Sequence, residues 1–415
     1  MSAVRQQALT LSAPVDLGRE AALDAWLRDN EPELKRRLSD SRTTHFARWA
    51  LLPPTLDEAG KPIGAQHLLL FETSFDGELS DHVADLRSAL GSWLDPAFGG
   101  VVGYPGAENL TELVEFFRRA SLRAASFHVA NRGLSVSVVH GDAALRRALE
   151  ARLCELSVGA IVQATDAVQL ARELRQVARA VARQNGLALG NAHRVPSRAA
   201  GRWALVARPF GLLLAFLLSP FFEWRDERVR RRQPSFDTPA LRERRDHLGR
   251  EEDRFDQNVL TELVAIKPGW YRPFCLKLML QLASALAAAG WRGGMRSVHF
   301  TRWVVLPDRR LLLSSYYDGS WQAHLSQLVG EAARVMTMIG THTIWFPSTR
   351  LLLFRGARDE PAFKAWMRAN QLPTQAWYSA YPALSVADVA KNAEIRELLG
   401  GELDAAAAER LLALL

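Results

Sequence analysis

Short runs of apolar, β-branched and aromatic residues alternate along this chain with segments in which apolar residues have helical spacing. The runs VHFTRWVVLP and RLLLSSYY, around residue 300, are short enough to predict two strands. The segment 320–338 places Leu325, Leu328 and Ala332 on one helical face, which predicts a helix. Further strands are expected at THTIWFP, TRLLLFRG and TQAWYSAYP, with a helix at DEPAFKAWMRAN.

The chain contains nearly the same sequence pattern in two places. THFARWALLP begins at Thr44, and VHFTRWVVLP begins at Val298. An Asp-Gly pair follows the next strand in both places, at Asp76 and Asp318, and residues 106–149 align with 356–399 without a gap. Matching blocks in the same order predict a duplicated domain.

Without its first strand, each copy has the order β-α-β-β-α-β of a split ferredoxin-like unit. The predicted fold class is therefore α+β, with two tandem ferredoxin-like repeats forming an intramolecular α/β barrel and an inserted helical region. The expected parts are a helical extension (1–42), repeat 1 (43–156), a helical insert (157–296), repeat 2 (297–400) and a C-terminal helix (401–415).

In element order and duplication, the chain resembles the dimeric α/β-barrel superfamily. That superfamily includes the dye-decolourising peroxidases and chlorite dismutase-like haem proteins. The chain is also similar to large tandem-repeat bacterial proteins with HFARW-type and DGSW-type blocks, a likeness that implies no activity. The superfamily resemblance implies haem as a cofactor, with His299 or His45 as the proximal ligand and Arg302 nearby.

The middle of the chain contains the apolar run RWALVARPFGLLLAFLLSPFFEW. Its uncharged core, from Pro209 to Phe222, is shorter than the roughly 20 residues that span a bilayer. Tryptophans flank the run and five arginines follow it, which favours an interfacial or re-entrant helix over a spanning helix or a soluble core helix. The expected membrane-contact residues are Trp203, Phe210, Leu213, Leu217, Phe221, Trp224, Arg230 and Arg231.

A second apolar stretch, 270–291, would lie beside the first. The net charge of +7 and the pI of about 9.7 are compatible with an anionic membrane surface as the partner. The segment 225–258 mixes both charge signs, so it predicts a solvated linker, and no nucleic acid is expected. Because the N-terminus has no apolar signal segment, the expected location is cytoplasmic, peripheral or monotopic at the membrane face.

Two repeat-equivalent histidine pairs, His45/His299 and His82/His324, could be ligands or could make structural hydrogen bonds. Strand alternation predicts that His299 and Trp303 share the face toward the space between the sheets, with Arg302 on the other face. The candidate ligand-binding residues are His45, His299, Arg48, Arg302, Trp49, Trp303, Asp318 and His342.

Neither cysteine has metal-site spacing, and no nucleotide-binding loop, zinc-protease motif or nucleophile elbow occurs. Each Asp-Gly pair fits a turn whose Asp caps the following helix. The first functional hypothesis is a membrane-surface protein that binds or modifies an apolar, lipid-like small molecule. The alternatives are a haem-dependent oxidoreductase and a non-catalytic interaction module. The sequence assigns neither a reaction nor an oligomeric state.

Overall fold

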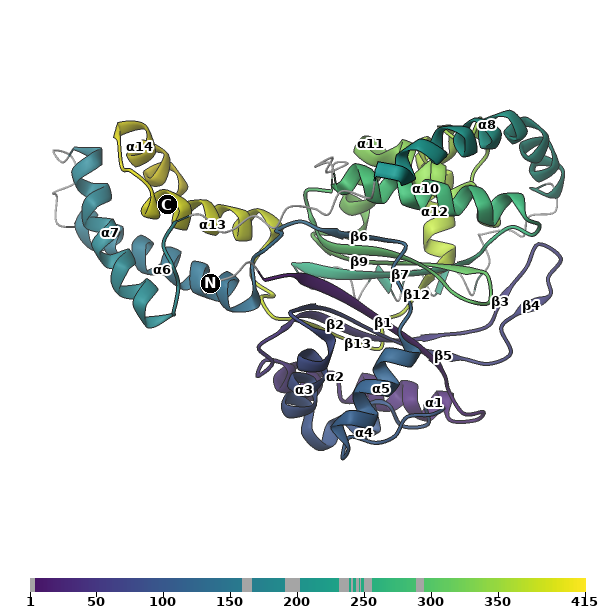
Figure 1. Cartoon of the computed structure of the whole chain (residues 1–415), viewed down its shortest axis with the longest axis horizontal. Helices are drawn as coiled ribbons and strands as arrows, with labels where there is room; N and C mark the ends of the chain where they lie inside the picture. The colour runs from purple at the N-terminus through teal and green to yellow at the C-terminus, as the bar shows by residue number, and fades with distance from the viewer. Residues whose placement is uncertain are drawn as a thin grey trace.

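The computed structural model describes residues 4–158, 166–190, 202–230, 256–288 and 295–415, with a few positions between 239 and 249. It contains long helices and antiparallel strands that pack on one another, which confirms the α+β class. Two sheets lie face to face, and each carries a layer of helices on its outer side (Figure 1).

The first sheet has four antiparallel strands in the order β1-β5-β2-β13. Three of them come from the N-terminal half of the chain, and the edge strand β13 comes from its C-terminal end. Their bounds are Gln6–Pro14 (β1), Leu68–Asp76 (β5), Thr44–Leu52 (β2) and Ala376–Ser379 (β13).

The second sheet has five antiparallel strands in the order β12-β7-β9-β8-β6. Its edge strand β6 comes from the N-terminal half, so the two halves exchange their last strands. The bounds are Gln371–Leu372 (β12), Gln257–Ala265 (β7), Arg310–Asp318 (β9), Val298–Val305 (β8) and Ser126–Val129 (β6). The described strands stay in separate sheets, and no closed barrel is found among them.

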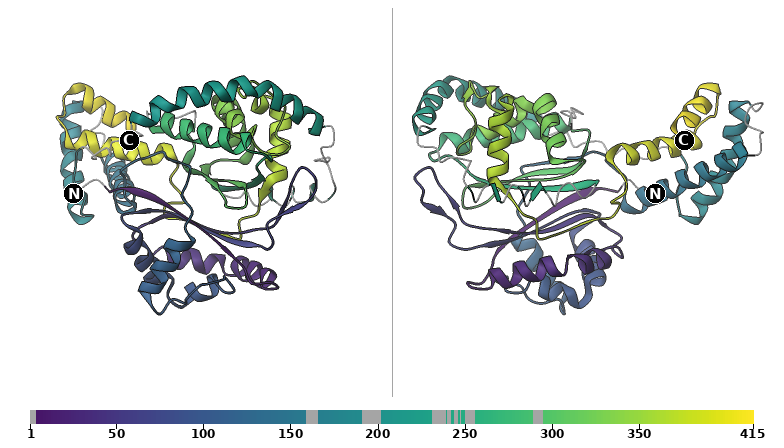
Figure 2. Two further views of the ribbon diagram at one scale, coloured as in Figure 1. Left: turned by 45° about the vertical axis from the view of Figure 1, so that its right-hand side comes forward. Right: turned by 180° about the vertical axis from the view of Figure 1, so that it is seen from behind.

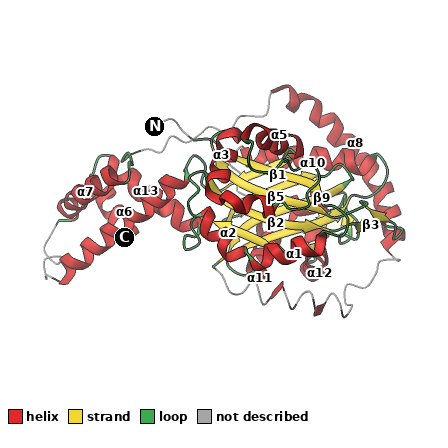
Figure 3. Ribbon diagram, turned by 90° about the horizontal axis from the view of Figure 1, so that it is seen from below, coloured by secondary structure: helices red, strands yellow, loops and turns green. Residues whose placement is uncertain are grey.

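Two groups of helices cover the outer faces of the sheets (Figures 1 and 3). Those of the N-terminal half pack on the first sheet: α1 (Glu20–Asp29), α2 (Glu31–Leu38), α3 (Leu79–Leu90), η1 (Gly91–Trp93), α4 (Leu94–Ala97) and α5 (Leu110–Ala120). Those of the C-terminal half lie over the second sheet: α8 (Arg202–Arg230), α10 (Tyr271–Ala288), α11 (Trp321–Gly340), η2 (Gly356–Arg358) and α12 (Glu360–Asn370).

The remaining helices form an arm beside the sheets, with a core of its own (Figure 2). They are α6 (Val136–Val158), α7 (Ala167–Gln184), α13 (Val386–Gly400) and α14 (Ala405–Leu414). α6 and α13 directly follow the exchanged strands β6 and β13. Apolar residues recur at helical spacing in 160–184, and the described part of this stretch forms α7, while 160–165 lies outside the described residues.

Several sequence boundaries need correction. The expected helical extension contains β1, and the expected helical insert contains β7. In both, apolar and polar residues alternate (ALTLSAP and NVLTELVA), a strand signal that was outweighed by the helical segments around it. The expected strands at 341–356 are reduced to an isolated bridge at Thr343 and a small hairpin of β10 (Thr349–Arg350) and β11 (Phe354–Arg355).

The space between the sheets is filled by the protein's own side chains. At one end, buried aliphatic residues from both sheets pack together: Ala50, Leu52, Leu70, Leu263, Val304, Leu306, Leu312 and Leu372. At the other end, Phe46 packs on Phe300 and Tyr316, with ring centroids 5.5 and 4.6 Å apart. A second small hairpin, β3 (Thr55–Leu56) with β4 (Pro62–Ile63), extends from the first half toward the second.

Candidate functional site

His45 lies at an irregularity of β2, where the pairing with β5 shifts between Thr44 and Phe46. Its ring is fully buried and both nitrogens are engaged. Nδ1 lies 3.0 Å from the Tyr381 hydroxyl, and Nε2 lies 3.0 Å from Asp76 Oδ1. No ring nitrogen remains for an iron atom, so His45 does not fit the proximal haem ligand that the resemblance implies.

His299 occupies the equivalent irregularity of β8. Its Nε2 lies 2.7 Å from Asp318 Oδ1 and 3.3 Å from the Gln257 side-chain nitrogen. Tyr381 stands between the two histidines, with ring centroids 5.8 Å from His45 and 5.9 Å from His299. The ring of His299 is buried and its Nε2 is already paired with a carboxylate, so it too is poorly placed as a haem ligand.

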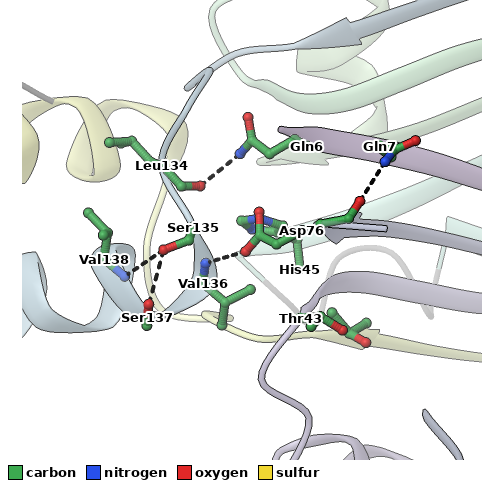
Figure 4. A network of polar contacts seen from close by, with 12 residues as sticks. Gln6, Gln7, Thr43, His45, Asp76, Leu134, Ser135, Val136, Ser137 and Val138 are labelled. Carbon is green, nitrogen blue, oxygen red and sulfur yellow. Dashed lines mark hydrogen bonds and ion pairs between the residues drawn. The ribbon is translucent and has the colours of Figure 1, made fainter. Parts of the chain in front are cut away.

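Each aspartate of the Asp-Gly pairs has two partners. Asp76 Oδ2 accepts a hydrogen bond of 2.8 Å from Val136 N, the first residue of α6 (Figure 4). Asp318 Oδ2 accepts the same bond, also 2.8 Å, from Val386 N at the start of α13. The aspartates therefore contact the N-termini of the arm helices and hold the histidines, rather than capping the next helices in sequence.

Arg48 and Arg302 point into the space between the sheets, so the predicted faces are wrong for them. Arg48 is fully buried and donates to Leu260 O and Thr261 Oγ1 at 2.8 and 2.9 Å. Arg302 makes the reciprocal contact, donating to Leu9 O at 2.7 Å. Each arginine thus crosses to the first strand of the opposite half.

The two-fold pattern of these arginines is broken by one carboxylate. Glu72 Oε2 lies 3.2 Å from Arg48 Nε, and Glu72 Oε1 lies 3.9 Å from Arg302 Nε. The equivalent position in the second half is Ser314, so one carboxylate serves two arginines. Tyr316, whose ring lies 4.1 Å from the Arg48 guanidinium carbon, has only Ser74 as its counterpart.

Trp49 and Trp303 face the helix layers instead of the space between the sheets. The Trp49 ring packs at a tilt against Phe71, with centroids 4.7 Å apart, and Phe71 contacts Phe98 and Phe117 on the helix side. Trp303 belongs to the core shared with α11 and α12. The irregularity at each histidine shifts the alternation by one residue, so histidine and arginine reach the inner space while tryptophan does not.

The other candidate histidines, His82, His324 and His342, are buried, and burial lowers the pKa of each. His82 accepts or donates at both nitrogens, to Thr43 and Thr73 at 2.8 Å each, and burial lowers the pKa of His82 and His324 to about 3. His342 lies in the turn after α11, and burial lowers its pKa well below the usual value. It joins a different group of residues, with Arg272 and Lys267 as charged neighbours.

Sequence reasoning missed that group, which consists of Asp226, Lys267 and Arg272 beside His342. Asp226 was assigned to a solvated linker, but α8 continues to Arg230 and buries it. The available signal was Lys267 itself, a lone cation directly after an apolar strand. The described residues contain no cluster of three or more histidine, cysteine or acidic side chains placed to hold a metal ion.

The predicted membrane residues on α8 form an exposed apolar stripe. Leu213, Leu217, Phe221 and Trp224 are 55%, 69%, 61% and 52% exposed. The side chains of Trp203, Phe210 and Arg230, and all of Arg231, lie outside what the structure describes. Within the described residues, no helix is long and apolar enough to cross a membrane.

A scan against protein families, a search of curated proteins and a search of solved structures each found no match.

Proposed function

We propose that this protein binds the surface of an anionic membrane through the outer face of α8. The observation that carries the proposal is the stripe of Leu213, Leu217, Phe221 and Trp224, which recurs at the four- and three-residue spacing of one helical face. The opposite face, with Ala215, Ser219 and Asp226, is buried against the protein. Exposed apolar side chains aligned along about three turns are typical of a surface that meets another apolar phase.

The start of α10 widens this surface. Trp270 is 64% exposed and Phe274 is 38% exposed. Tyr271 fixes α10 to α8, because its ring stacks on Phe222 at 3.9 Å and its hydroxyl donates to Ala215 O at 2.6 Å. The two helices therefore present their tryptophans as one rigid unit, as interfacial anchors would.

Basic residues adjoin the apolar stripe. Arg228 places its guanidinium 3.6 Å from the Trp224 ring, and Arg225 lies one residue beyond that tryptophan. Three further arginines follow at 230–232. Basic residues near an anionic membrane contribute about 1 kcal/mol each, so this end of α8 favours anionic over neutral lipid.

Sedimentation with lipid vesicles tests this proposal. The full chain is expected to pellet with phosphatidylglycerol vesicles, weakly with phosphatidylcholine vesicles, and less in high salt. Leu217→Glu/Phe221→Glu should abolish pelleting. The matched control Leu17→Glu/Val102→Glu changes two exposed apolar residues of the other half and should pellet like the parent. A parent protein that stays in the supernatant with anionic vesicles at low salt would show that the proposal is wrong.

We also infer that the chain is a tandem duplication of a ferredoxin-like unit whose two copies exchange their last strands. The support is the shared order of the sheets, in which the first, third and second strands of one half are followed by the last strand of the other. On this view the chain is an intramolecular form of the dimeric α/β-barrel arrangement. The apolar, lipid-like small molecule of the first functional hypothesis stays a prediction.

A second candidate function is recruitment of an acidic partner by the arm. Arg172, Arg179 and Arg183 are exposed along one side of α7, with Arg175 beside them. Burial and the neighbouring Arg179 and Arg172 lower the pKa of Arg175, so the stripe is crowded with like charge. The double change Arg172→Glu/Arg179→Glu should abolish the binding of polyglutamate and leave vesicle binding intact. If the changed protein still binds polyglutamate like the parent, this second candidate function is wrong.

A further inference from the structure

The two halves build the same junction at the end of their first strand but occupy it differently. In the first half, Val15 bridges Val101, and Asp16 N donates to Gly100 O at 2.7 Å. In the second half, Ile266 bridges Thr343, and Lys267 N donates to His342 O at 2.9 Å. The first half forms this junction with an exposed aspartate and a glycine, so the backbone does not require a buried lysine and histidine there.

Lys267 belongs to a buried group of charges. Its Nζ lies 2.8 Å from Asp226 Oδ2 and 2.9 Å from Thr341 O. Arg272 contacts the same carboxylate oxygen. Lys267, Arg272 and Asp226 are 5%, 0% and 6% exposed. Burial lowers the pKa of Lys267 to about 8, which leaves it charged at pH 7, so two buried cations share one carboxylate.

Several polar atoms of this group have no hydrogen-bond partner among the described residues. Among the described residues, Arg272 Nε and Nη1 and both ring nitrogens of His342 make no hydrogen bond. Leaving a buried polar group unpaired costs about 1–3 kcal/mol, and native interiors satisfy most such groups. The adjacent positive charge and the unpaired donors both favour a missing acceptor that carries negative charge.

Two further described carboxylates near this group do not supply that acceptor, and Asp226 Oδ1 is itself unpaired among the described residues. Glu58, on the β3–β4 hairpin, has its pKa raised by burial despite the nearby Lys267, and it makes no ion pair with a described residue. Glu223 is occupied by the backbone, accepting from Leu351 N and Leu352 N at 2.9 Å each.

The backbone around this group is strained. All described non-glycine residues with positive φ lie in the second half, and they are Arg309, Trp345, Leu351, Leu352 and Arg355. Such conformations cost on the order of 1–3 kcal/mol each and gather at ligand sites. Glu223, which accepts hydrogen bonds from Leu351 N and Leu352 N, belongs to α8, the helix that also carries Asp226. The strained hairpin and the charged group are thus fastened to the same helix.

We propose that Lys267, Arg272 and His342 form a binding site for an oxyanion, a phosphate or a carboxylate group. One such group balances the unpaired cation and accepts hydrogen bonds from the free donors of Arg272 and from His342. Asp226 holds the two cations in place. The site lies on the buried face of α8, opposite the apolar stripe, so it stands independently of the proposed membrane surface.

Calorimetric titration of the full chain with inorganic phosphate and with acetate tests the site. One of the two anions is expected to bind with a one-to-one stoichiometry. Arg272→Met should weaken binding at least tenfold, and Arg272→Lys should restore part of it. The matched control Arg309→Met removes a nearby arginine that donates to Gly269 O and should bind like the parent.

If Arg272→Met fails to fold, His342→Phe replaces it as the test variant, because it removes both ring nitrogens from an apolar setting. Absence of binding by the parent to either anion at 10 mM would overturn the proposal, as would equal affinity in the parent and in Arg272→Met.

The source of the oxyanion is distinguished with vesicles of phosphatidic acid. If a lipid phosphate enters the site, Arg272→Met weakens vesicle binding together with phosphate binding. If the ligand is a free anion, Arg272→Met loses phosphate or acetate binding and still pellets with vesicles. Leu217→Glu/Phe221→Glu should do the reverse, so failure of the membrane proposal and failure of the anion site give different patterns.

Discussion

Glu72 lies between Arg48 and Arg302, and removing its negative charge should be one of the most destabilising single changes in this protein. Glu72→Gln keeps the shape of the side chain and an acceptor for Thr10 Oγ1, which donates to Glu72 Oε1 at 2.9 Å. It removes only the charge. All three ionic side chains are at most 1% exposed, so solvent cannot replace the lost carboxylate.

The size of the effect follows from the distances. At an effective dielectric constant of about 20, unit charges 3.2 and 3.9 Å apart attract by about 5 and about 4 kcal/mol. The desolvation cost of the carboxylate, which the glutamine avoids, offsets part of this. Breaking a buried ion pair by removing one partner costs about 3–5 kcal/mol, and we expect Glu72→Gln to fall in that range.

Urea unfolding followed by tryptophan fluorescence measures this loss. The surface control Glu115→Gln breaks a pair with Arg118 at 2.8 Å and should change the free energy of unfolding by less than about 1 kcal/mol. Glu72→Gln combined with Arg302→Met should be less destabilised than the sum of the two single changes, because the second change removes one uncompensated cation. Additive losses, or a Glu72→Gln effect as small as the control, would refute the charge-sharing argument.

Three further outcomes are expected. Burial lowers the pKa of His82 and His324 to about 3, so below about pH 6.5 the unfolded chain binds more protons than the folded chain. As the pH falls from about 6.5, the free energy of unfolding should therefore decrease by up to about 1.4 kcal/mol per pH unit for each histidine. The double change His82→Gln/His324→Gln should flatten this slope in urea titrations between pH 4 and 8. Glu262 is buried with both carboxyl oxygens unpaired among the described residues, and burial raises its pKa well above the usual value. Because the buried side chain favours the protonated form, the folded state becomes less stable relative to the unfolded state as the pH rises. Glu262→Leu should therefore increase the free energy of unfolding at pH 8, and a decrease would contradict this prediction. Asp76→Asn should cost about 1–2 kcal/mol and speed hydrogen exchange at the start of α6, an effect that Asp318→Asn should reproduce at α13.

The spacing of apolar residues along the sequence was sufficient to predict helices and strands that do not depend on contacts with distant parts of the chain. The helix expected at 320–338 is α11, because its apolar residues recur every three to four positions and Ser320 caps it by accepting from Ala323 N. The apolar run after Trp203 is helical as expected, and its outward stripe was named residue by residue. The likeness of β2 and β8 was also visible, because both carry His, Phe, Arg and Trp at the same spacing, and that the two halves are copies stays an inference.

What the sequence could not indicate depends on partners far along the chain. β6 pairs with β8 and β13 pairs with β2, an exchange that no local pattern encodes. The irregular pairing at His45 and His299 moves the following residues by one position, which inverted the predicted faces of arginine and tryptophan. Asp226 was misassigned because only Lys267 and Arg272, about 40 residues later, make its burial favourable.

Comparison of the two similar halves helps to separate residues that the shared fold explains from residues that it does not. Where the two halves carry the same side chain with the same contacts, as with Asp76 and Asp318 at the arm helices, the shared fold is a sufficient explanation. Where one half keeps the backbone contact but changes the side chain, as Lys267 does relative to Asp16, folding alone does not account for the change. The exposed stripe of α8 has no counterpart among the described residues of the first half, because α8 precedes β7, whereas β1 already begins at Gln6. The differences that the shared fold does not explain therefore concentrate beside α8 in the second half, whereas the paired histidines near the arm contact equivalent aspartates in both halves.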